Sequence, residues 1–174
     1  MPRNPMNNSE QVSATIPDWS RECVQQGDWE PGRELIRSIR GYQAARARGG
    51  FASLIISRFW VLAHRFWSAV AGTDIPINTE IGGGLALPHP NGIVIHVNSK
   101  IGPNCLLFQQ VTLGGNEHGA PTLIGHVDVG AGAKILGKIT IGAHAKIGAN
   151  SVVLIDVPEG ATAVGIPAKL LPKK

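Results

Sequence analysis

The most regular feature of the chain is an aliphatic residue that recurs every six positions through its second half. The spacing runs from residue 75 to residue 153 and is interrupted twice, by two extra residues between positions 87 and 95 and by four extra residues between positions 113 and 123. The positions of this ladder are Ile75, Ile81, Leu87, Ile95, Ile101, Leu107, Leu113, Leu123, Val129, Ile135, Ile141, Ile147 and Val153.

A period of six matches neither the 3.6-residue repeat of a helix nor the two-residue repeat of a strand. It predicts short strands joined by tight turns. One such unit cannot bury its apolar side alone, so the units must stack into a solenoid with the aliphatic ladder pointing inward. Glycine often follows the aliphatic residue, where it relieves backbone crowding. Small or β-branched residues, which suit a narrow corner, stand four positions after it: Thr79, Ser99, Cys105, Val111, Val127, Ala133, Ala145 and Ser151.

The first third of the chain has helical spacing instead. We expect one helix from Arg33 to Arg48, ended by Gly49 and Gly50, and a second from about Phe51 to Ala71. Residues 1–15 have no apolar periodicity and are expected to be disordered. In the second helix an apolar and aromatic stripe, expected to pack in the core or between subunits, contains Leu54, Ile55, Phe59, Leu62, Phe66 and Val70, with Trp60 and Trp67 beside it.

Composition places a domain boundary near Gly72. Eight of the nine aromatic residues lie in residues 1–67, all nine arginines precede residue 66, and 17 of the 22 glycines lie at or after Gly72. We therefore expect a helical segment over residues 1–71 and a solenoid domain with a C-terminal tail over residues 72–174.

Several classes of protein are disfavoured. The net charge of +4 comes with no basic run and no interleaved aromatic patch, so we expect no nucleic-acid partner. Arg58, His64 and Arg65 interrupt the apolar stretch 51–71, which is then too short to span a membrane. The polar N-terminus is not a signal peptide, and two distant cysteines, Cys23 and Cys105, fit reduced thiols in a cytoplasm.

Candidate chemistry lies at the two interruptions, because regular coils make poor active sites and loops carry function. The first interruption, residues 87–96, holds His89 and His96. The second, residues 113–122, holds His118.

An ordered series of segments resembles the serine O-acetyltransferase family, which are hexapeptide-repeat acyltransferases. The segments are 74–76, 81–84, 89–95, 109–115, 130–137, 145–153 and 165–169, with the insertions in the family's places. The resemblance implies a mainly β fold, a left-handed parallel β-helix of hexapeptide repeats with a short N-terminal α-helical domain. The left hand comes from the resemblance alone, since parallel crossovers are generally right-handed.

The resemblance also implies two catalytic residues. The family's catalytic histidine matches His89, and its carboxylate partner, fifteen residues earlier, matches Asp74. The chemistry fits these residue types. A histidine that titrates near neutrality can remove the proton of an alcohol, and a carboxylate can fix the histidine tautomer and stabilise the imidazolium.

The donor implied by the family is acetyl-CoA, a co-substrate, with no tightly bound cofactor and no metal. The matching donor-site positions are Gly114, Gly115, Ala131, Ala149 and Lys169, with Lys173 and Lys174 as further cations for the phosphates. Asn91 and His118 are candidate acceptor-binding residues. The family implies donor sites in grooves between subunits, so we expect a homotrimer, and helix 51–71 as a possible joint between two trimers.

The acceptor stays open at this point. The family has aspartate where this chain has Pro88, and an arginine–histidine pair where it has Gly119 and Ala120. L-serine is the acceptor that the family implies, and a sugar hydroxyl in polysaccharide assembly is the alternative. Two other classes share the architecture: zinc carbonic anhydrases, with His89, His96 and His118 as ligands, and non-catalytic scaffolds.

Overall fold

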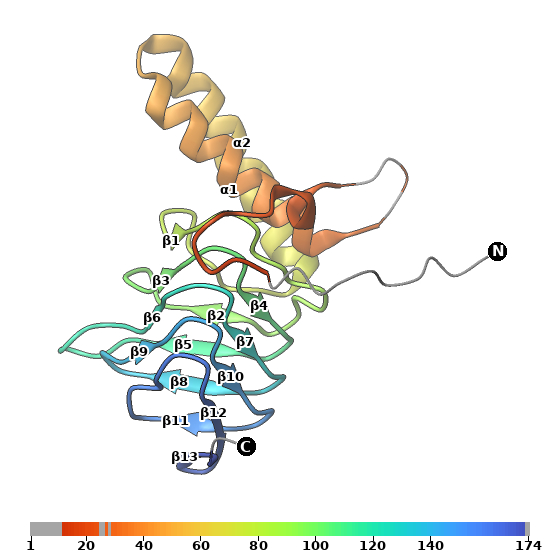
Figure 1. The fold of residues 1–174 in the computed structure, drawn as a ribbon. Helices are drawn as coiled ribbons and strands as arrows, with labels where there is room; N and C mark the ends of the chain where they lie inside the picture. Colours follow the sequence, from red (N-terminus) through yellow and green to blue (C-terminus); the bar gives the residue numbers. More distant parts are fainter. Residues whose placement is uncertain (1–11, 25–26, 28, 173–174) are drawn as a thin grey trace.

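A computed structural model describes residues 12–24, 27 and 29–172 of the chain. They form a three-sided solenoid with a helical hairpin projecting from its N-terminal end (Figure 1). The helical elements are the short 3-10 helix η1 (Trp19–Glu22), α1 (Pro31–Arg48) and α2 (Phe51–Ala71).

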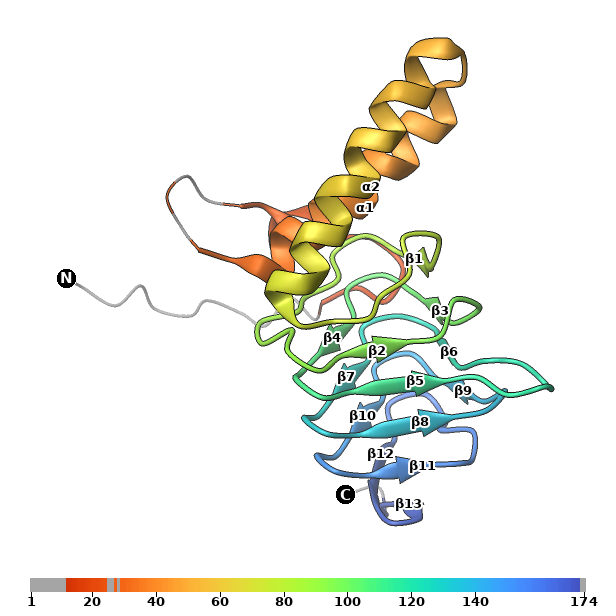
Figure 2. The same ribbon diagram turned by 180° about the vertical axis from the view of Figure 1, so that it is seen from behind.

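The solenoid has three parallel faces of very short strands, seen from behind in Figure 2. Face one contains β1 (Glu80–Ile81), β3 (Lys100–Ile101), β6 (Thr122–Leu123) and β9 (Thr140–Ile141). Face two contains β4 (Leu106–Leu107), β7 (Asp128–Val129), β10 (Lys146–Ile147), β12 (Thr162–Gly165) and the antiparallel β13 (Ala168–Leu170). Face three contains β2 (Val94–Ile95), β5 (Thr112–Gly114), β8 (Lys134–Leu136) and β11 (Val152–Val153).

The predicted ladder forms the core of this solenoid. All thirteen aliphatic positions are at most 7% exposed, and the small residues four positions later are fully buried or nearly so. The register stacks equivalent positions, so that Ile95 lies on Leu113 and Leu113 on Ile135. The prediction of a mainly β solenoid of six-residue units with a short helical region is confirmed, and the architecture is consistent with the left-handed β-helix that the resemblance implies.

The turns use two different backbone devices. Glycine directly after the aliphatic residue permits close approach of the next coil: a Cβ on Gly102 would collide with the carbonyl oxygen of Ile124. Three positions after the aliphatic residue the backbone turns through the left-handed region. Asn104, His126 and His144 occupy this position, with φ of 58°, 46° and 59°. These three stack at the corner between faces one and two. The Nδ1 atoms of the two histidines are 2.7 Å apart, and burial lowers the pKa of His126.

The helical hairpin packs through small residues. Trp60 of α2 lies against Gly41 of α1, and the buried side chains of α2 are Ser53, Ser57 and Ala71. The sequence predicts that the aromatic stripe of α2 packs in the core or between subunits. In the single chain only part of it does so: Trp67 packs against the core and Trp60 against α1, whereas Leu62 is 65% exposed. Close approach of the two backbones at the small residues turns the large ones outward. No helix among the described residues is long and apolar enough to cross a bilayer.

Residues 12–24 form an extended N-terminal strap that lies along the corner between faces one and two. The carboxamide of Asn104 is central to it. Its Oδ1 accepts from the amide of Asp18 at 2.7 Å, and its Nδ2 donates to the carbonyls of Ser13 at 2.7 Å and Ile16 at 2.8 Å. Residues 12–15, expected to be disordered, are therefore bound to the solenoid, while residues 1–11 lie outside the described residues.

We predict that Asn104→Gly releases the strap without disturbing the corner. Glycine keeps the left-handed backbone, so only the three side-chain hydrogen bonds are lost, at a cost of about 1–3 kcal/mol. Limited proteolysis should cut within residues 12–24 faster, and thermal unfolding should begin at a lower temperature. Asn150→Gly, the same change at an exposed left-handed corner, is the control. Equal protection of the strap in both variants would contradict this role for Asn104.

Candidate active site

The first interruption of the repeat forms a loop, residues 88–92, at the corner between faces two and three. His89 is exposed on this loop, and its ring centroid lies 6.5 Å from that of Phe108 on the next coil. The loop is tied on both sides: the amide of Gly92 donates to the carbonyl of Gly72 at 2.7 Å, and the amide of Gln110 donates to the carbonyl of Asn91 at 2.9 Å. His89 is thus an accessible imidazole on a fixed backbone.

Asp74 lies on the adjoining part of face three, directly after the end of α2. Its amide donates to the carbonyl of Ile93 at 2.8 Å, and its carbonyl accepts from the amide of Ile95 at 2.9 Å. These bonds place Asp74 one coil above β2, two residues after the glycine that holds the His89 loop. Both side chains are exposed, and within the described part of the chain no ion pair or hydrogen bond joins them. In the described part of a single chain, Asp74 and His89 therefore lie near the same edge of the solenoid but are not joined by a hydrogen bond or an ion pair.

The predicted donor-site residues lie in three places. Ala131 and Ala149 lie on the same solenoid edge as His89, on successive coils, and the amide of Asn150 donates to the carbonyl of Ala131 at 2.8 Å. Gly114 and Gly115 lie at the far end of face three, where β5 ends. Lys169 is exposed on β13, while Lys173 and Lys174 lie outside the described residues.

The second interruption forms a loop that projects from the corner between faces three and one, between β5 and β6 (Figure 2). Asn116 and Gly119 close its tip with two backbone hydrogen bonds of 2.8 and 3.1 Å. His118 is exposed there, 3.4 Å from the carboxylate of Glu117. Face three separates this loop from the His89 edge by roughly 16 Å, the length of about five extended residues. One chain does not bring His118 and His89 together.

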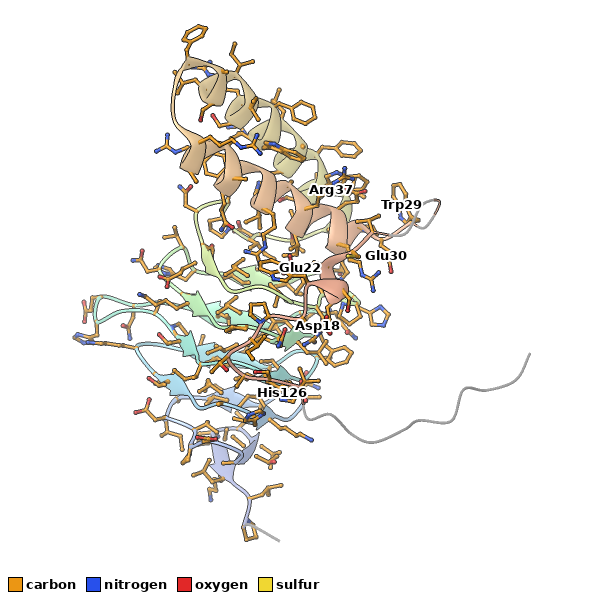
Figure 3. All side chains as sticks on the ribbon, turned by 45° about the horizontal axis from the view of Figure 1, so that its top comes forward. Asp18, Glu22, Trp29, Glu30, Arg37 and His126 are labelled. Atoms are coloured by element: carbon orange, nitrogen blue, oxygen red, sulfur yellow. The ribbon has the colours of Figure 1, made fainter. Side chains whose placement is uncertain are left out.

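A cavity of about 400 Å³, which no sequence pattern predicted, lies beside the His89 loop. The prolines on either side of His89 line one wall, and the opposite wall comes from the strap, the residues just before α1 and the start of α1, with Arg21, Trp29, Glu30 and Arg33. Figure 3 shows Trp29 and Glu30 at the base of the hairpin. The guanidinium of Arg33 donates to Glu30 at 2.8 Å and to the carbonyl of Cys23 at 2.7 Å. No local pattern marks these residues, because the cavity joins segments more than fifty positions apart.

The histidines needed for the zinc alternative are also dispersed. His96 packs against Gly115, and its Nδ1 accepts from the amide of Asn98 at 3.2 Å, while His89 lies at another corner and His118 lies on the tip of the projecting loop. Among the described residues, no group of three or more histidine, cysteine or acidic side chains is placed to hold a metal ion.

Comparison with known proteins decides the family. No protein-family model matches the chain. The serine acetyltransferase of Helicobacter pylori strain 26695 is 46% identical over 144 residues, which cover 79% of this chain and 81% of that protein. The chain belongs to the serine acetyltransferase family. The serine acetyltransferase of Synechococcus elongatus is 44% identical over 106 residues, but those residues cover only 43% of its length.

Solved structures of serine acetyltransferases agree with this assignment. A serine acetyltransferase in complex with CoA is 37% identical with a TM-score of 0.69, and it matches 82% of this chain. A serine acetyltransferase of Neisseria gonorrhoeae in complex with serine is 36% identical with a TM-score of 0.69. The chain spans 58% and 57% of these two solved chains, so it matches somewhat over half of their length.

Proposed function

We propose that this protein is an acetyl-CoA-dependent O-acetyltransferase that acetylates the hydroxyl of L-serine to give O-acetylserine for cysteine biosynthesis, and that it does so in the cytoplasm. The observation that carries the proposal is the 46% identity to a serine acetyltransferase across both the helical region and the solenoid. Related serine acetyltransferases have been solved in complex with CoA and with serine, and these complexes suggest the donor and the acceptor.

His89 is the proposed general base, and its exposure on a fixed loop suits that role. It removes the proton of the acceptor hydroxyl while the oxygen attacks the thioester carbonyl. The new C–O bond forms a tetrahedral intermediate, the C–S bond then breaks, and the imidazolium returns its proton to the departing CoA sulfur. Asp74 acts through His89 by favouring one tautomer and stabilising the imidazolium. This role requires the Asp74 carboxylate to turn toward His89 when the substrates are bound.

The proposed donor site follows the edge that carries His89. Ala131 and Ala149 leave the backbone open on successive coils below the loop, so an extended pantetheine arm can lie against peptide groups there. Lys169 is an exposed cation for the CoA phosphates. Gly114 and Gly115 lie at the far end of face three, where the Leu136 side chain and the His96 ring pack against them.

The cavity beside the loop favours an amino acid over a sugar as the acceptor. An amino acid carries an ammonium and a carboxylate, and the cavity wall offers Arg21 and Arg33 as cations and Glu30 as an anion. These residues can supply the charges that Pro88, Gly119 and Ala120 do not. Asn91 and His118 remain proposed acceptor contacts. A sugar acceptor needs only neutral hydrogen bonds. Removing a cation from the cavity wall should therefore weaken the binding of an amino acid but not that of a sugar.

We further propose a homotrimer whose site is shared between subunits. The projecting loop and the His89 edge of one chain lie on opposite sides of face three, so a complete site needs the loop of a neighbouring copy. Gly114, Gly115 and His118 would then face the His89 edge of the next subunit.

We predict that His89→Ala lowers kcat for acetyl transfer at least about 10²-fold while CoA binding is retained, because the base acts on the acceptor. Asp74→Asn should lose less, since the imidazole stays in place. Initial rates of thiol release and calorimetric CoA titration measure the two effects. Near-normal kcat in the His89 variant would refute the assignment and direct attention to His118.

The acceptor is tested by thiol release from acetyl-CoA with L-serine and with a panel of sugars and nucleotide sugars. We expect turnover with L-serine, and we expect Arg33→Ala to raise the KM for serine about tenfold or more with little change in kcat, the effect of one charge-assisted hydrogen bond. Arg37→Ala, one turn along α1 and outside the cavity, is the matched control. No turnover with serine beside turnover with a sugar would establish the alternative.

The shared site is tested with two inactive variants, His89→Ala and a chain lacking residues 116–119, whose deletion restores the uninterrupted six-residue period. We predict that hybrids refolded from a mixture of both regain activity, because one site in a mixed trimer combines an intact His89 with an intact loop. Light scattering gives the mass of each species. A stable monomer with full activity would disprove the shared site.

A further inference from the structure

Two histidines that take no part in the proposed reaction face each other at the corner between faces one and two. His126 and His144 lie on successive coils, and both are half-buried. Their Nδ1 atoms are 2.7 Å apart, and their ring centroids are 5.0 Å apart. A hydrogen bond between two Nδ1 atoms needs one that carries a proton and one that does not. The pair can therefore keep this bond only while at least one of the two rings is neutral.

The first part of the strap, residues 12–18, lies on the same corner. Figure 3 shows Asp18 and His126 along one edge of the solenoid. The carbonyl oxygen of Ala14 is so close to the backbone of Gly125, the neighbour of His126, that a Cβ on this glycine would collide with it. Residues 12–15 also line a surface hollow together with Ala143, His144 and Glu159. The strap therefore contributes to the burial of the two imidazole rings.

The surroundings of the pair disfavour a second proton. Burial is the largest cause of the lowered pKa of His126. The charges of Arg21 on the strap and Lys146 on β10 lower this pKa further, as does His144, whereas the Asp128 carboxylate on β7 raises it. The other charged side chain beside the pair is Glu159, which lines the hollow with His144. When both rings are protonated, the hydrogen bond between them is lost and two cations lie next to each other.

Proton binding and strap binding therefore oppose each other. Since the strap buries the pair, the open corner takes up a second proton more readily than the covered corner, and by linkage that proton favours the open corner. We propose that His126 and His144 form a pH-sensitive latch, which holds residues 12–18 on the solenoid near neutral pH and releases them in mild acid. The stability that the latch contributes is complete above the pKa of an ordinary histidine, about 6.5, and is lost as the pH falls below it.

The latch is connected to the cavity beside the His89 loop. Opening breaks the three hydrogen bonds that join the Asn104 carboxamide to the strap. The carbonyl of the same Asn104 accepts from the Arg21 guanidinium at 2.5 Å, and Arg21 lines the cavity wall. Release of the strap therefore loosens the support of one cation of that wall. An effect on the acceptor rests on the proposed function, whereas the latch itself does not.

The test is amide hydrogen exchange of the full chain at about pH 7.5 and about pH 5.5, with each rate corrected for the intrinsic pH dependence of exchange. The amide of Asp18, which donates to Asn104, reports the strap, and the amide of Leu107 in β4 reports the solenoid. We expect the protection of Asp18 to fall about tenfold in acid, the effect of one proton taken up with ordinary histidine affinity. The protection of Leu107 should not change. The Asp18 carboxyl does not titrate in this range, because hydrogen bonds from Ser20 lower its pKa.

The variant His126→Asn with His144→Asn removes the titrating pair. Asparagine keeps the left-handed backbone, as it does at Asn104 and Asn150, where φ is 58° and 56°. In this variant the protection of Asp18 should be the same at both pH values. The matched control is His64→Gln, which removes a histidine of α2 outside the corner and should keep the loss of protection in acid. Thermal unfolding near neutral pH verifies that each variant is folded.

A reciprocal measurement uses the unmodified histidines. Because Asn104→Gly frees the strap, the pKa of His126 in that variant, measured by NMR titration, should rise toward the ordinary value. Equal protection of Asp18 at both pH values in the unmodified chain would overturn the latch. An equal loss of protection in the chain that lacks both histidines would overturn it as well, since another group would then carry the pH dependence.

Discussion

The ion pair between Glu22 and Arg40 closes the open end of the solenoid, and the positions of the other N-terminal elements depend on it. A β-helix ends in a coil whose outward peptide groups have no partner. Here one oxygen of the Glu22 carboxylate accepts from the amides of Gly84 and Leu85 at 2.7 and 3.1 Å, and Arg40 donates to the carbonyls of Ile81 and Gly82 at 2.7 and 2.6 Å. The two side chains also bind each other at 2.8 Å.

This closure fixes two parts of the chain, the strap and α1, against the first coil. Glu22 belongs to the strap and Arg40 to α1, and the peptide groups that these two residues bind belong to the first coil. The wall of the proposed acceptor cavity is therefore held relative to the His89 loop. Trp19 covers the Arg40 guanidinium, whose carbon lies 5.4 Å from the ring centroid. Both partners are largely shielded from water, so removing either would leave a buried charge unpaired. The proposed acceptor specificity thus depends on a contact that touches no substrate.

The sequence predicts what repeats, and it does not predict contacts between distant segments. The ladder, the two interruptions and the helix bounds follow from local spacing. The sequence could therefore predict that Leu113 points into the core and that His89 lies on a loop. Glu22 and Arg40 look like ordinary surface charges, because the backbone atoms that they bind lie forty or more residues away. The left-handed turns at Asn104 and His144 also lack a glycine signal. Most large apolar residues of α2 face outward because its small residues pack against α1. Large apolar residues usually indicate the buried face of a helix, so the sequence pattern alone does not show which side packs against α1.

The strap is the first part of the fold to be synthesised, but it can bind only after later parts of the chain have been made. The hairpin closes locally, and each coil needs only the coil 16 to 22 residues earlier or later, as in Thr112 on Lys134 or Lys146 on Thr162. The strap is synthesised first, yet Ser13 must wait for Asn104, 91 residues later. Contacts of such long sequence separation form late. During synthesis the N-terminus therefore stays unbound until the second coil has left the ribosome, and the cavity, whose last lining residue is Leu106, cannot form before then.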